Sequence, residues 1–302
     1  MTNKRIALIG CGIWGLKILR DLQALACVVS VFDPDPEREL QATAAGAVDF
    51  STEPLTSSDY DGIIVATPSS THRTVLEAID HLGLPIFLEK PLTTNYPDAL
   101  ALQQQLQSEV FLMHVWLYHP GIQALAEIAQ SGELGEVLGL RTTRANWTSP
   151  RRDTDSVWNL SPHDLTITQA ILGYLPPARA AVLETPSATH RGMLAILGQR
   201  PYSIIEVSNR YERKIREVRL HCSEGIAVLR DEKVRHLDIY RGDEHSQLAE
   251  AEKRPFANDY PLLLELQEFI AYLEGGSPPR SSLADGVKIV KAIDELITLA
   301  QQ

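Results

Sequence analysis

The feature that most constrains the fold is a glycine-rich turn near the N-terminus. Gly10-Cys11-Gly12-Ile13-Trp14-Gly15 has the pattern G-x-G-x-x-G and directly follows the apolar run Arg5–Ile9. Apolar residues then recur at helical spacing over residues 16–25, and a second apolar run, residues 27–32, ends at Asp33. This order of strand, turn, helix, strand and acid predicts the start of a doubly wound, parallel α/β sheet.

The three glycines suit a dinucleotide. Gly10 lets the chain turn sharply off the strand, Gly12 lets a pyrophosphate approach the backbone, and Gly15 lets the helix lie close to the strand. The free N–H groups at the start of the helix then face the phosphates. The turn is therefore predicted to bind a nicotinamide dinucleotide.

The acid that ends the second strand bears on which dinucleotide binds. The Asp33 carboxylate can accept hydrogen bonds from both ribose hydroxyls, and it would repel a 2′-phosphate. This favours NAD over NADP as the cofactor. Arg38, in the next turn, is the residue that could hold a phosphate instead; the alternative is a solvated helix residue.

Composition excludes several classes of protein. A chain of 302 residues suggests two domains at the usual ~100–200 residues each. The formal charge of -11 argues against nucleic-acid and anionic-membrane binding through bulk charge. The three widely spaced cysteines form no metal motif and suggest reduced thiols. With no signal peptide and no apolar run long enough to span a bilayer, we expect a cytoplasmic protein.

Further strands alternate with helices up to about Leu117. Apolar runs at residues 63–66, 85–88 and 110–113 are separated by helical patterns, which predicts a parallel sheet covered on both faces. Ligands of such sheets lie beyond the carboxyl ends of the strands. We therefore expect residues 1–117 to form the cofactor domain, with these residues at its site: Gly10, Gly12, Ile13, Trp14, Gly15, Asp33, Thr67, Pro68, His72, Glu89 and Lys90.

The rest of the chain, residues 118–302, has a different pattern. It begins with a predicted helix at residues 121–130 and becomes strand-rich from Gly135, with one helix at 164–172 among the strands and closing helices at 262–273 and 283–299, the last of which is expected to pack back toward the cofactor domain. This predicts an α+β domain with a large, mostly antiparallel, open-faced sheet. An open apolar face predicts a homo-oligomer, a dimer or tetramer, formed through this sheet. The predicted strands cover residues 137–144, 178–184, 192–197, 203–208, 215–222, 226–229 and 234–240.

Several motifs together resemble the Gfo/Idh/MocA oxidoreductases, named for glucose–fructose oxidoreductase and inositol dehydrogenase. The glycine turn is joined by Ala66-Thr67-Pro68, Glu89-Lys90-Pro91-Leu92, the run from Leu117 to Pro120, the run from Gly132 to Val137, the run from Trp158 to Asp164, and Ala284-Asp285-Gly286. The resemblance covers almost the whole chain, and its most specific part is the E-K-P element. It implies hydride transfer between a nicotinamide and a carbohydrate or cyclic polyol.

The resemblance also implies roles for individual residues. The lysine of E-K-P and the histidine of a D-x-x-x-H element act at the substrate, which gives Lys90 and His163 catalytic roles here. Asn159 stands where D-x-x-x-H has its acid, as in members that act on nucleotide-linked sugars. The expected substrate-binding residues are Lys90, Tyr118, Asn146, Arg151, Arg152, Asn159 and His163, in which the arginines could hold a carboxylate or phosphate or form a solvated loop.

Oxidising a secondary alcohol requires a base for the hydroxyl proton. His163 suits that role with a reference pKa of about 6.5. Lys90 can take the proton only if its pKa is lowered; otherwise its charge stabilises the developing alkoxide. The sequence thus favours an NAD-dependent oxidoreductase of a carbohydrate, with a nucleotide-linked or acidic sugar as one candidate substrate. The alternatives are a dehydrogenase or reductase of another small cyclic polyol or carbonyl, and a non-catalytic cofactor-binding sensor of the same fold.

Overall fold

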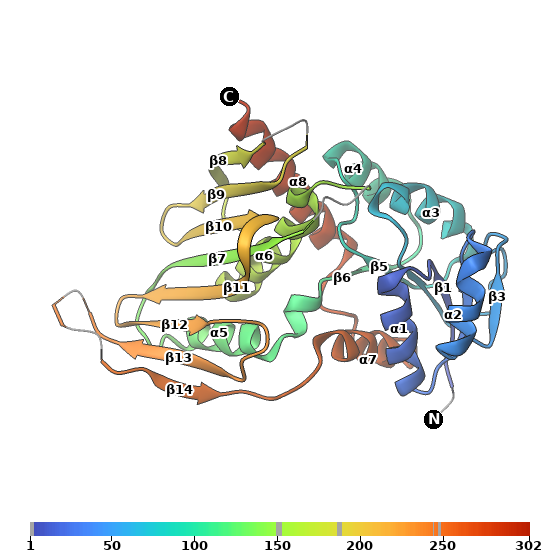
Figure 1. The fold of residues 1–302 in the computed structure, drawn as a ribbon, viewed down its shortest axis with the longest axis horizontal. Helices are drawn as coiled ribbons and strands as arrows, with labels where there is room; N and C mark the ends of the chain where they lie inside the picture. The colour runs from blue at the N-terminus through green and yellow to red at the C-terminus, as the bar shows by residue number, and fades with distance from the viewer. Residues whose placement is uncertain (1–2, 149–152, 186–188, 244, 247–248) are drawn as a thin grey trace. The chain divides into compact units, whose positions relative to one another are not determined.

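The structure is a computed structural model that describes residues 3–148, 153–185, 189–243, 245–246 and 249–302 (Figure 1). Its chain forms two compact units. The first comprises Met1–Val115 and Leu262–Val290, and the second comprises Trp116–Pro261 and Lys291–Gln302. The sequence-based boundary after Leu117 remains a prediction, and the two units are described separately below.

The first unit contains a six-stranded, fully parallel sheet with the order β3-β2-β1-β4-β5-β6 (Figure 1). This confirms the predicted doubly wound fold. Its elements are β1 (Arg5–Ile9), α1 (Ile13–Ala24), β2 (Val28–Phe32), α2 (Glu39–Ala44), β3 (Asp49–Ser51), β4 (Gly62–Val65), α3 (His72–Ile79), β5 (Ile86–Glu89), α4 (Tyr96–Gln105), β6 (Val110–Met113), α7 (Pro261–Leu273) and the first part of α8 (Leu283–Ala300).

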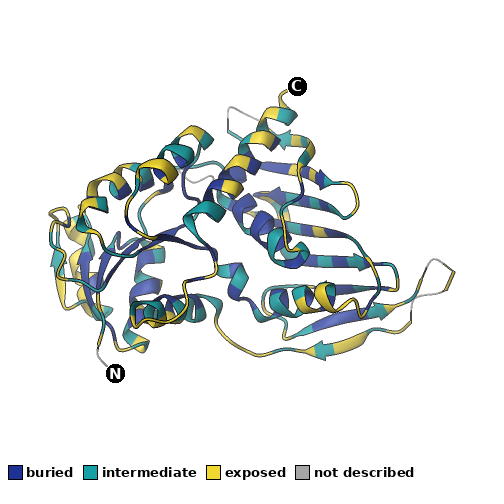
Figure 2. Ribbon diagram, turned by 180° about the vertical axis from the view of Figure 1, so that it is seen from behind, coloured by how far each residue is buried: buried dark blue, intermediate teal, exposed yellow. Residues whose placement is uncertain are grey.

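Apolar side chains on both faces hold this sheet between helices. On one face, α1 and α7 pack onto the strands, and Phe87 of β5 stacks on Phe269 of α7 with ring centroids 4.9 Å apart. The strands are buried along most of their length, while the outer sides of the helices are exposed (Figure 2). Strands buried on both faces explain why their sequences are apolar runs and not alternating patterns.

The second unit is built on an eight-stranded sheet with the order β14-β13-β12-β11-β7-β10-β9-β8. Every neighbouring pair is antiparallel except β7 and β10, which confirms the predicted mostly antiparallel sheet. Its elements are α5 (Pro120–Ser131), β7 (Val137–Trp147), α6 (Ser156–Leu172), β8 (Ala178–Glu184), β9 (Gly192–Gly198), β10 (Tyr202–Ser208), β11 (Arg210–Cys222), β12 (Gly225–Leu229), β13 (His236–Arg241), β14 (Glu252–Pro255) and the end of α8.

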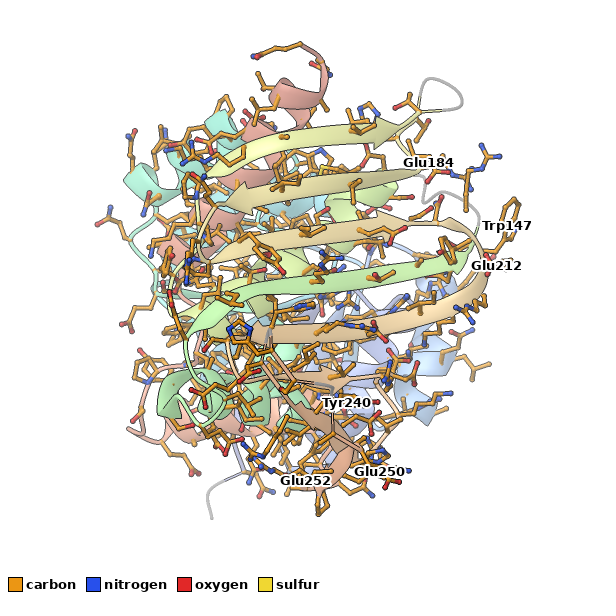
Figure 3. The ribbon with its side chains drawn as sticks, turned by 90° about the vertical axis from the view of Figure 1, so that its left-hand side faces the viewer. Trp147, Glu184, Glu212, Tyr240, Glu250 and Glu252 are labelled. Carbon is orange, nitrogen blue, oxygen red and sulfur yellow. The ribbon has the colours of Figure 1, made fainter. Side chains whose placement is uncertain are left out.

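Helices of the second unit lie against one face of this sheet. Both α5 and α6 pack on it, while Figure 3 looks onto the opposite face, where side chains stand free of any helix of this unit. Large apolar side chains are exposed among them, with exposed fractions of 67% for Val182, 47% for Leu194 and 39% for Ile196. The sheet is thus open-faced, as predicted.

One predicted helix boundary is wrong. The helix expected to begin at Asp164 begins at Ser156, because the Asp155 carboxylate accepts a hydrogen bond from the Trp158 N–H and caps the first turn. Pro162 lies inside the helix, although proline lacks the N–H that a helix interior uses. His163 therefore lies within α6 and does not open it.

Among the described residues, no helix is long and apolar enough to cross a membrane.

Candidate functional site

The glycine turn of the first unit has the geometry that a dinucleotide requires. Gly10 has φ +93°, and a Cβ there would lie 2.7 Å from the Ala66 carbonyl oxygen. A Cβ on Gly15 would lie 2.2 Å from the Gly10 carbonyl oxygen, so only glycine lets α1 approach β1 this closely. A Cβ on Gly12 would meet nothing within 4 Å, which leaves open space at the helix N-terminus. The open space and the free N–H groups fit a pyrophosphate.

Asp33 is oriented by the same turn. Its Oδ2 accepts a hydrogen bond of 2.7 Å from the Cys11 N–H, and its Oδ1 accepts one of 3.0 Å from the Asp35 N–H. The carboxylate is partly exposed at the end of β2, where a ribose can reach it. The Arg38 Nε lies 3.3 Å from the Asp35 carboxylate, so this arginine has an acidic partner of its own. The site therefore favours a ribose with a free 2′-hydroxyl.

His72 joins the loops that follow β4 and β5. It is fully buried, with its Nδ1 2.7 Å from the Pro91 carbonyl oxygen and its Nε2 3.1 Å from the Thr67 carbonyl oxygen. Burial lowers the pKa of His72, and the charge of Lys90 acts in the same direction. A neutral imidazole carries one N–H, and the shorter contact assigns it to Nδ1. His72 thus supports the E-K-P loop, while its contact with the cofactor stays a prediction.

The E-K-P loop is also tied to the glycine turn. The Trp14 indole N–H donates a hydrogen bond to the carboxylate of Glu89, which is buried at the end of β5. Lys90 follows directly and is half-buried. Ile13 is exposed on the first turn of α1, and Thr67 and Pro68 lie at the end of β4. The structure thus places all of the expected cofactor residues at the carboxyl ends of the parallel strands, in one unit.

A buried histidine that sequence reasoning missed lies near Lys90. His114 is buried after β6, with its Nδ1 2.7 Å from the Ser281 Oγ. Burial lowers the pKa of His114 to about 4; the charge of Asp285 opposes this shift and that of Lys90 adds to it. At neutral pH the His114 imidazole is therefore uncharged and adds no positive charge near Lys90.

In the second unit, Asn159 and His163 lie one helical turn apart on α6. Both are half-buried, while their neighbours Trp158, Leu160 and Asp164 are buried. Residues four apart share a helix face, so the amide and the imidazole point to the same side of α6. The sequence-based helix began only at Asp164 and did not give this arrangement, which puts an amide and an imidazole on one helix face.

A buried ion pair holds α6 against the sheet. The Arg144 Nε lies 2.6 Å from the Asp164 Oδ2, and their side chains are 4% and 1% exposed. The Arg144 guanidinium also stacks over the Trp116 ring, 4.3 Å from its centroid. Because Asp164 follows His163 directly, the pair fixes the rotation of α6 and the direction in which His163 points.

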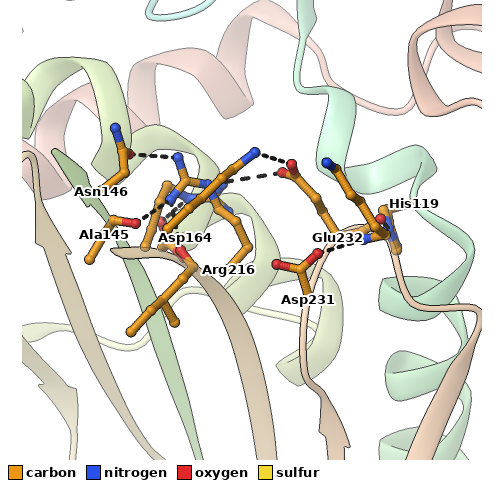
Figure 4. A network of polar contacts seen from close by, with 11 residues as sticks. His119, Ala145, Asn146, Asp164, Arg216, Asp231 and Glu232 are labelled. Atoms are coloured by element: carbon orange, nitrogen blue, oxygen red, sulfur yellow. Dashed lines mark hydrogen bonds and ion pairs between the residues drawn. The ribbon is translucent and has the colours of Figure 1, made fainter. Parts of the chain in front are cut away.

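A polar network continues from this pair along the sheet (Figure 4). The Arg216 guanidinium donates to the Ala145 carbonyl oxygen at 2.9 Å and to the Asn146 Oδ1 at 2.8 Å. Glu232 accepts from Lys214 and lies 4.0 Å from the Arg216 Nε. Burial lowers the pKa of Arg216, and the neighbouring Arg144 adds to this effect. Asn146, a predicted substrate ligand, is thus oriented by Arg216.

The remaining predicted substrate residues divide into two groups. Tyr118 is buried, at 2% exposure, in a short helical turn before α5. Arg151 and Arg152 lie outside the described residues. Sequence reasoning missed Arg144 and Arg216, although one signal was present: Arg144 occupies the same side of β7 as the buried residues Leu140 and Thr142. Among the described residues, no cluster of three or more His, Cys, Asp or Glu side chains could hold a metal ion.

Comparison with known proteins identifies the first unit. Residues 4–115 match the family described as "Oxidoreductase family, NAD-binding Rossmann fold", the Gfo/Idh/MocA family. The match extends over these residues, which make up less than half of the chain. The match confirms the resemblance drawn from the sequence motifs, and it confirms NAD as the dinucleotide of this Rossmann fold.

Curated proteins similar to this chain include named dehydrogenases. It is 30% identical over 192 residues to inositol 2-dehydrogenase 4 of Saccharopolyspora erythraea, covering 57% of this chain and 56% of that protein. It is 30% identical over 186 residues to UDP-N-acetylglucosamine 3-dehydrogenase of Acidithiobacillus ferrooxidans, covering 58% and 56%. The chain spans about half the length of the curated relatives it matches.

Solved structures share the fold of the whole chain. A levoglucosan dehydrogenase in complex with NADH and L-sorbose matches with a TM-score of 0.87 at 17% identity, covering 100% of this chain and 97% of that one. The UDP-N-acetylglucosamine 3-dehydrogenase structure from Acidithiobacillus ferrooxidans matches with a TM-score of 0.83 at 22% identity, covering 100% and 99%. At these identities the likeness establishes the fold of both units.

The buried ion pair gives a stability prediction. Asp164→Asn leaves the Arg144 charge buried without its partner, which should lower the free energy of unfolding by about 3–5 kcal/mol in urea denaturation. Glu136→Gln is the matched control, because Glu136 pairs with Arg200 on the surface, where both side chains are more than half exposed. A loss no larger than that of the control would show that Arg144 and Asp164 do not stabilise the fold as a pair.

His114 gives a pH prediction. Its folded pKa of about 4 lies below the ordinary value of 6.5, so unfolding takes up a proton between these two pH values. Stability should therefore be complete above pH 6.5 and fall as the pH drops toward 4, by about 1.4 kcal/mol per pH unit from this group. His114→Gln should remove that part of the slope, whereas His81→Gln, at an exposed position, should keep it. Equal slopes in all three proteins would refute the assignment.

Proposed function

We propose that the chain is an NAD-dependent dehydrogenase that transfers a hydride between the nicotinamide and a secondary alcohol or ketone of a carbohydrate or cyclic polyol. The observation that carries the proposal is the fixed position of Lys90. It follows β5 at the carboxyl end of the NAD-binding sheet, and Glu89 before it is bonded to Trp14 of the glycine turn. A lysine held at the nucleotide site in this way supports a role for Lys90 in the reaction.

The cofactor and the side chains have separate roles in the proposed reaction. NAD, when bound, accepts the hydride from the substrate carbon. The glycine turn and Asp33 bind its pyrophosphate and ribose, while Asn159, His163 and Asn146 hold the substrate in the second unit. Lys90 and His163 are the proposed reactive groups: one takes the hydroxyl proton and the other stabilises the developing charge.

The proposal extends to substrate and location. Relatives named for inositol and for UDP-N-acetylglucosamine support a cyclic polyol or a nucleotide-linked sugar. Asn159, in place of the acid of D-x-x-x-H, favours the nucleotide-linked or acidic class. The three cysteines are buried free thiols, which supports a reducing compartment, the cytoplasm. The proposed domains remain residues 1–117 for the cofactor and 118–302 for the substrate.

A second candidate is a sensor that binds NAD without turnover. Asn159 favours it, because an amide cannot act as the carboxylate that the family pattern has at this position. Lys90 and His163 favour the enzyme, since a sensor needs neither a proton acceptor nor a stabilised alkoxide.

The reactive pair gives the first functional prediction. With any sugar or polyol that reduces NAD, Lys90→Met and His163→Ala should each lower kcat by roughly 100- to 10,000-fold, while the Kd for NAD changes little. If the two groups act as a unit in the same step, the double variant should lose much less than the product of the single losses. Lys291→Met, on the exposed side of α8, is the control. Turnover like that of the wild type in both single variants would place the chemistry elsewhere.

Asp33 gives a prediction on cofactor choice. The wild type should bind NAD at least about tenfold more tightly than NADP, because Asp33 would face the 2′-phosphate. Asp33→Asn should reduce the preference for NAD over NADP, and Arg38→Ala should leave it unchanged. The measurement is the dissociation constant of each cofactor for each protein. Equal or tighter NADP binding by the wild type, lost in Arg38→Ala, would instead make Arg38 the phosphate ligand.

The open sheet face gives a prediction on assembly. We propose that two copies pair through this face and bury Val182, Leu194 and Ile196, as a dimer or as half of a tetramer. Light scattering should show an oligomer at micromolar concentration, and Leu194→Glu combined with Ile196→Glu should give a monomer. Leu40→Glu, at an exposed position of α2, should remain oligomeric. A wild-type monomer at that concentration would refute the pairing.

A further inference from the structure

A buried carboxyl group in α7 has no place in the reaction described above. Glu265 is fully buried, and neither its Oε1 nor its Oε2 has a hydrogen-bond partner in the part of the chain that the structure describes. A buried carboxyl group without hydrogen-bond partners destabilises a fold, so the burial of Glu265 needs an explanation.

The packing of α7 places this carboxyl next to the E-K-P element. The last turn of α7 lies over the start of β4, because a Cβ on Gly62 would meet Leu273 and Phe269. Followed backwards from Leu273 to Glu265, the helix therefore leads toward the carboxyl ends of the strands. Glu265 lies one turn before Phe269, and Glu89 lies two residues after Phe87, the stacking partner of Phe269. The steps from Phe269 to Glu265 and from Phe87 to Glu89 both lead toward the carboxyl end of β5. The Glu265 and Glu89 carboxyl groups are therefore neighbours.

The charges around this position favour one ionised carboxyl out of two. Burial raises the pKa of Glu265 well above its usual value, and Glu89 from β5 and Glu268 from α7 add to the effect. From α1, Trp14 donates its indole N–H to Glu89, and Lys17 lies over the Trp14 ring at 4.9 Å. Glu89 thus has a donor that stabilises its negative charge, whereas Glu265 has none.

We propose that Glu265 is a positioning residue for Lys90. As a neutral carboxylic acid, Glu265 fills the space beside Glu89 and leaves the Glu89 carboxylate bonded to Trp14. Since Glu89 precedes Lys90 directly, this bond sets the position of the lysine relative to the glycine turn. A second negative charge at Glu265 would repel Glu89 from Trp14 and displace Lys90. The inference rests on the proposed role of Lys90 in hydride transfer.

The proposal gives Glu265 a defined pH response. Alkaline pH removes its proton, so the Trp14–Glu89 bond and the turnover that depends on Lys90 should weaken together. Glu265→Gln has nearly the same shape and cannot ionise, so it should keep the neutral-pH arrangement at every pH. Glu268→Gln is the matched control, since Glu268 is on the same helix, partly exposed and next to Arg280.

The first measurement is a fluorescence titration of the full chain from about pH 6 to about pH 10, a range that spans the raised values known for buried carboxyls. Subtracting the signal of Trp14→Phe isolates Trp14 from the other three tryptophans. The wild type and Glu268→Gln should show an alkaline transition of Trp14, and Glu265→Gln should not. A wild type without this transition, or a transition that Glu265→Gln retains, would overturn the proposal.

The second measurement is the pH profile of kcat for the same proteins. Glu265→Gln should match the wild type near neutral pH and retain its turnover at alkaline pH, where the wild type should lose roughly tenfold or more as Lys90 is displaced. Identical profiles would show that Glu265 has a packing role only and would overturn the positioning role. Absence of turnover in every protein would contradict the proposed function, while the Trp14 titration would still decide whether Glu265 controls Glu89.

Discussion

The close approach of α1 to β1 is the constraint on which the nucleotide site depends. A Cβ on Gly15 would lie 2.2 Å from the Gly10 carbonyl oxygen, so any larger residue would push the helix away from the sheet. The approach brings the free N–H groups of α1 to the carboxyl ends of the strands, beside Asp33. It also brings Trp14 within reach of Glu89. One backbone contact thus positions both the cofactor-binding turn and the loop that carries Lys90.

A buried ion pair has the corresponding role in the second unit. The Arg144 and Asp164 side chains are buried, and the Arg144 guanidinium contacts both the Asp164 carboxylate and the Trp116 ring. Replacing a buried ion pair by apolar groups often leaves the stability of a fold unchanged. The main effect of this pair is therefore to fix the orientation of α6. In this fold it fixes the helix face on which Asn159 and His163 lie. In each unit, the proposed reactive side chain therefore lies on or directly after a helix or strand that is fixed by buried contacts.

The sequence predicted the elements that local pattern determines. The strand boundaries of β1 and β6 agree with the structure, because buried apolar runs flanked by turns have few alternatives. The start of α6 was wrong, because the Asp155 side chain caps the helix and the helix begins at Ser156, before Pro162. The strand β14 was missed, since its residues, Glu252–Pro255, are charged and lie at the sheet edge. Arg144 and Glu265 were missed because a buried charge is defined by tertiary neighbours that periodicity does not show.

The central claim is that the chain turns over NAD and does not merely bind it. The most direct test is the absorbance of reduced nicotinamide when the full chain and NAD are offered a panel of cyclic polyols, free sugars, acidic sugars and nucleotide-linked sugars. The account predicts that at least one of them reduces NAD catalytically, with many turnovers per chain. Saturating NAD binding without reduction by any member of the panel would contradict the account and favour a sensor.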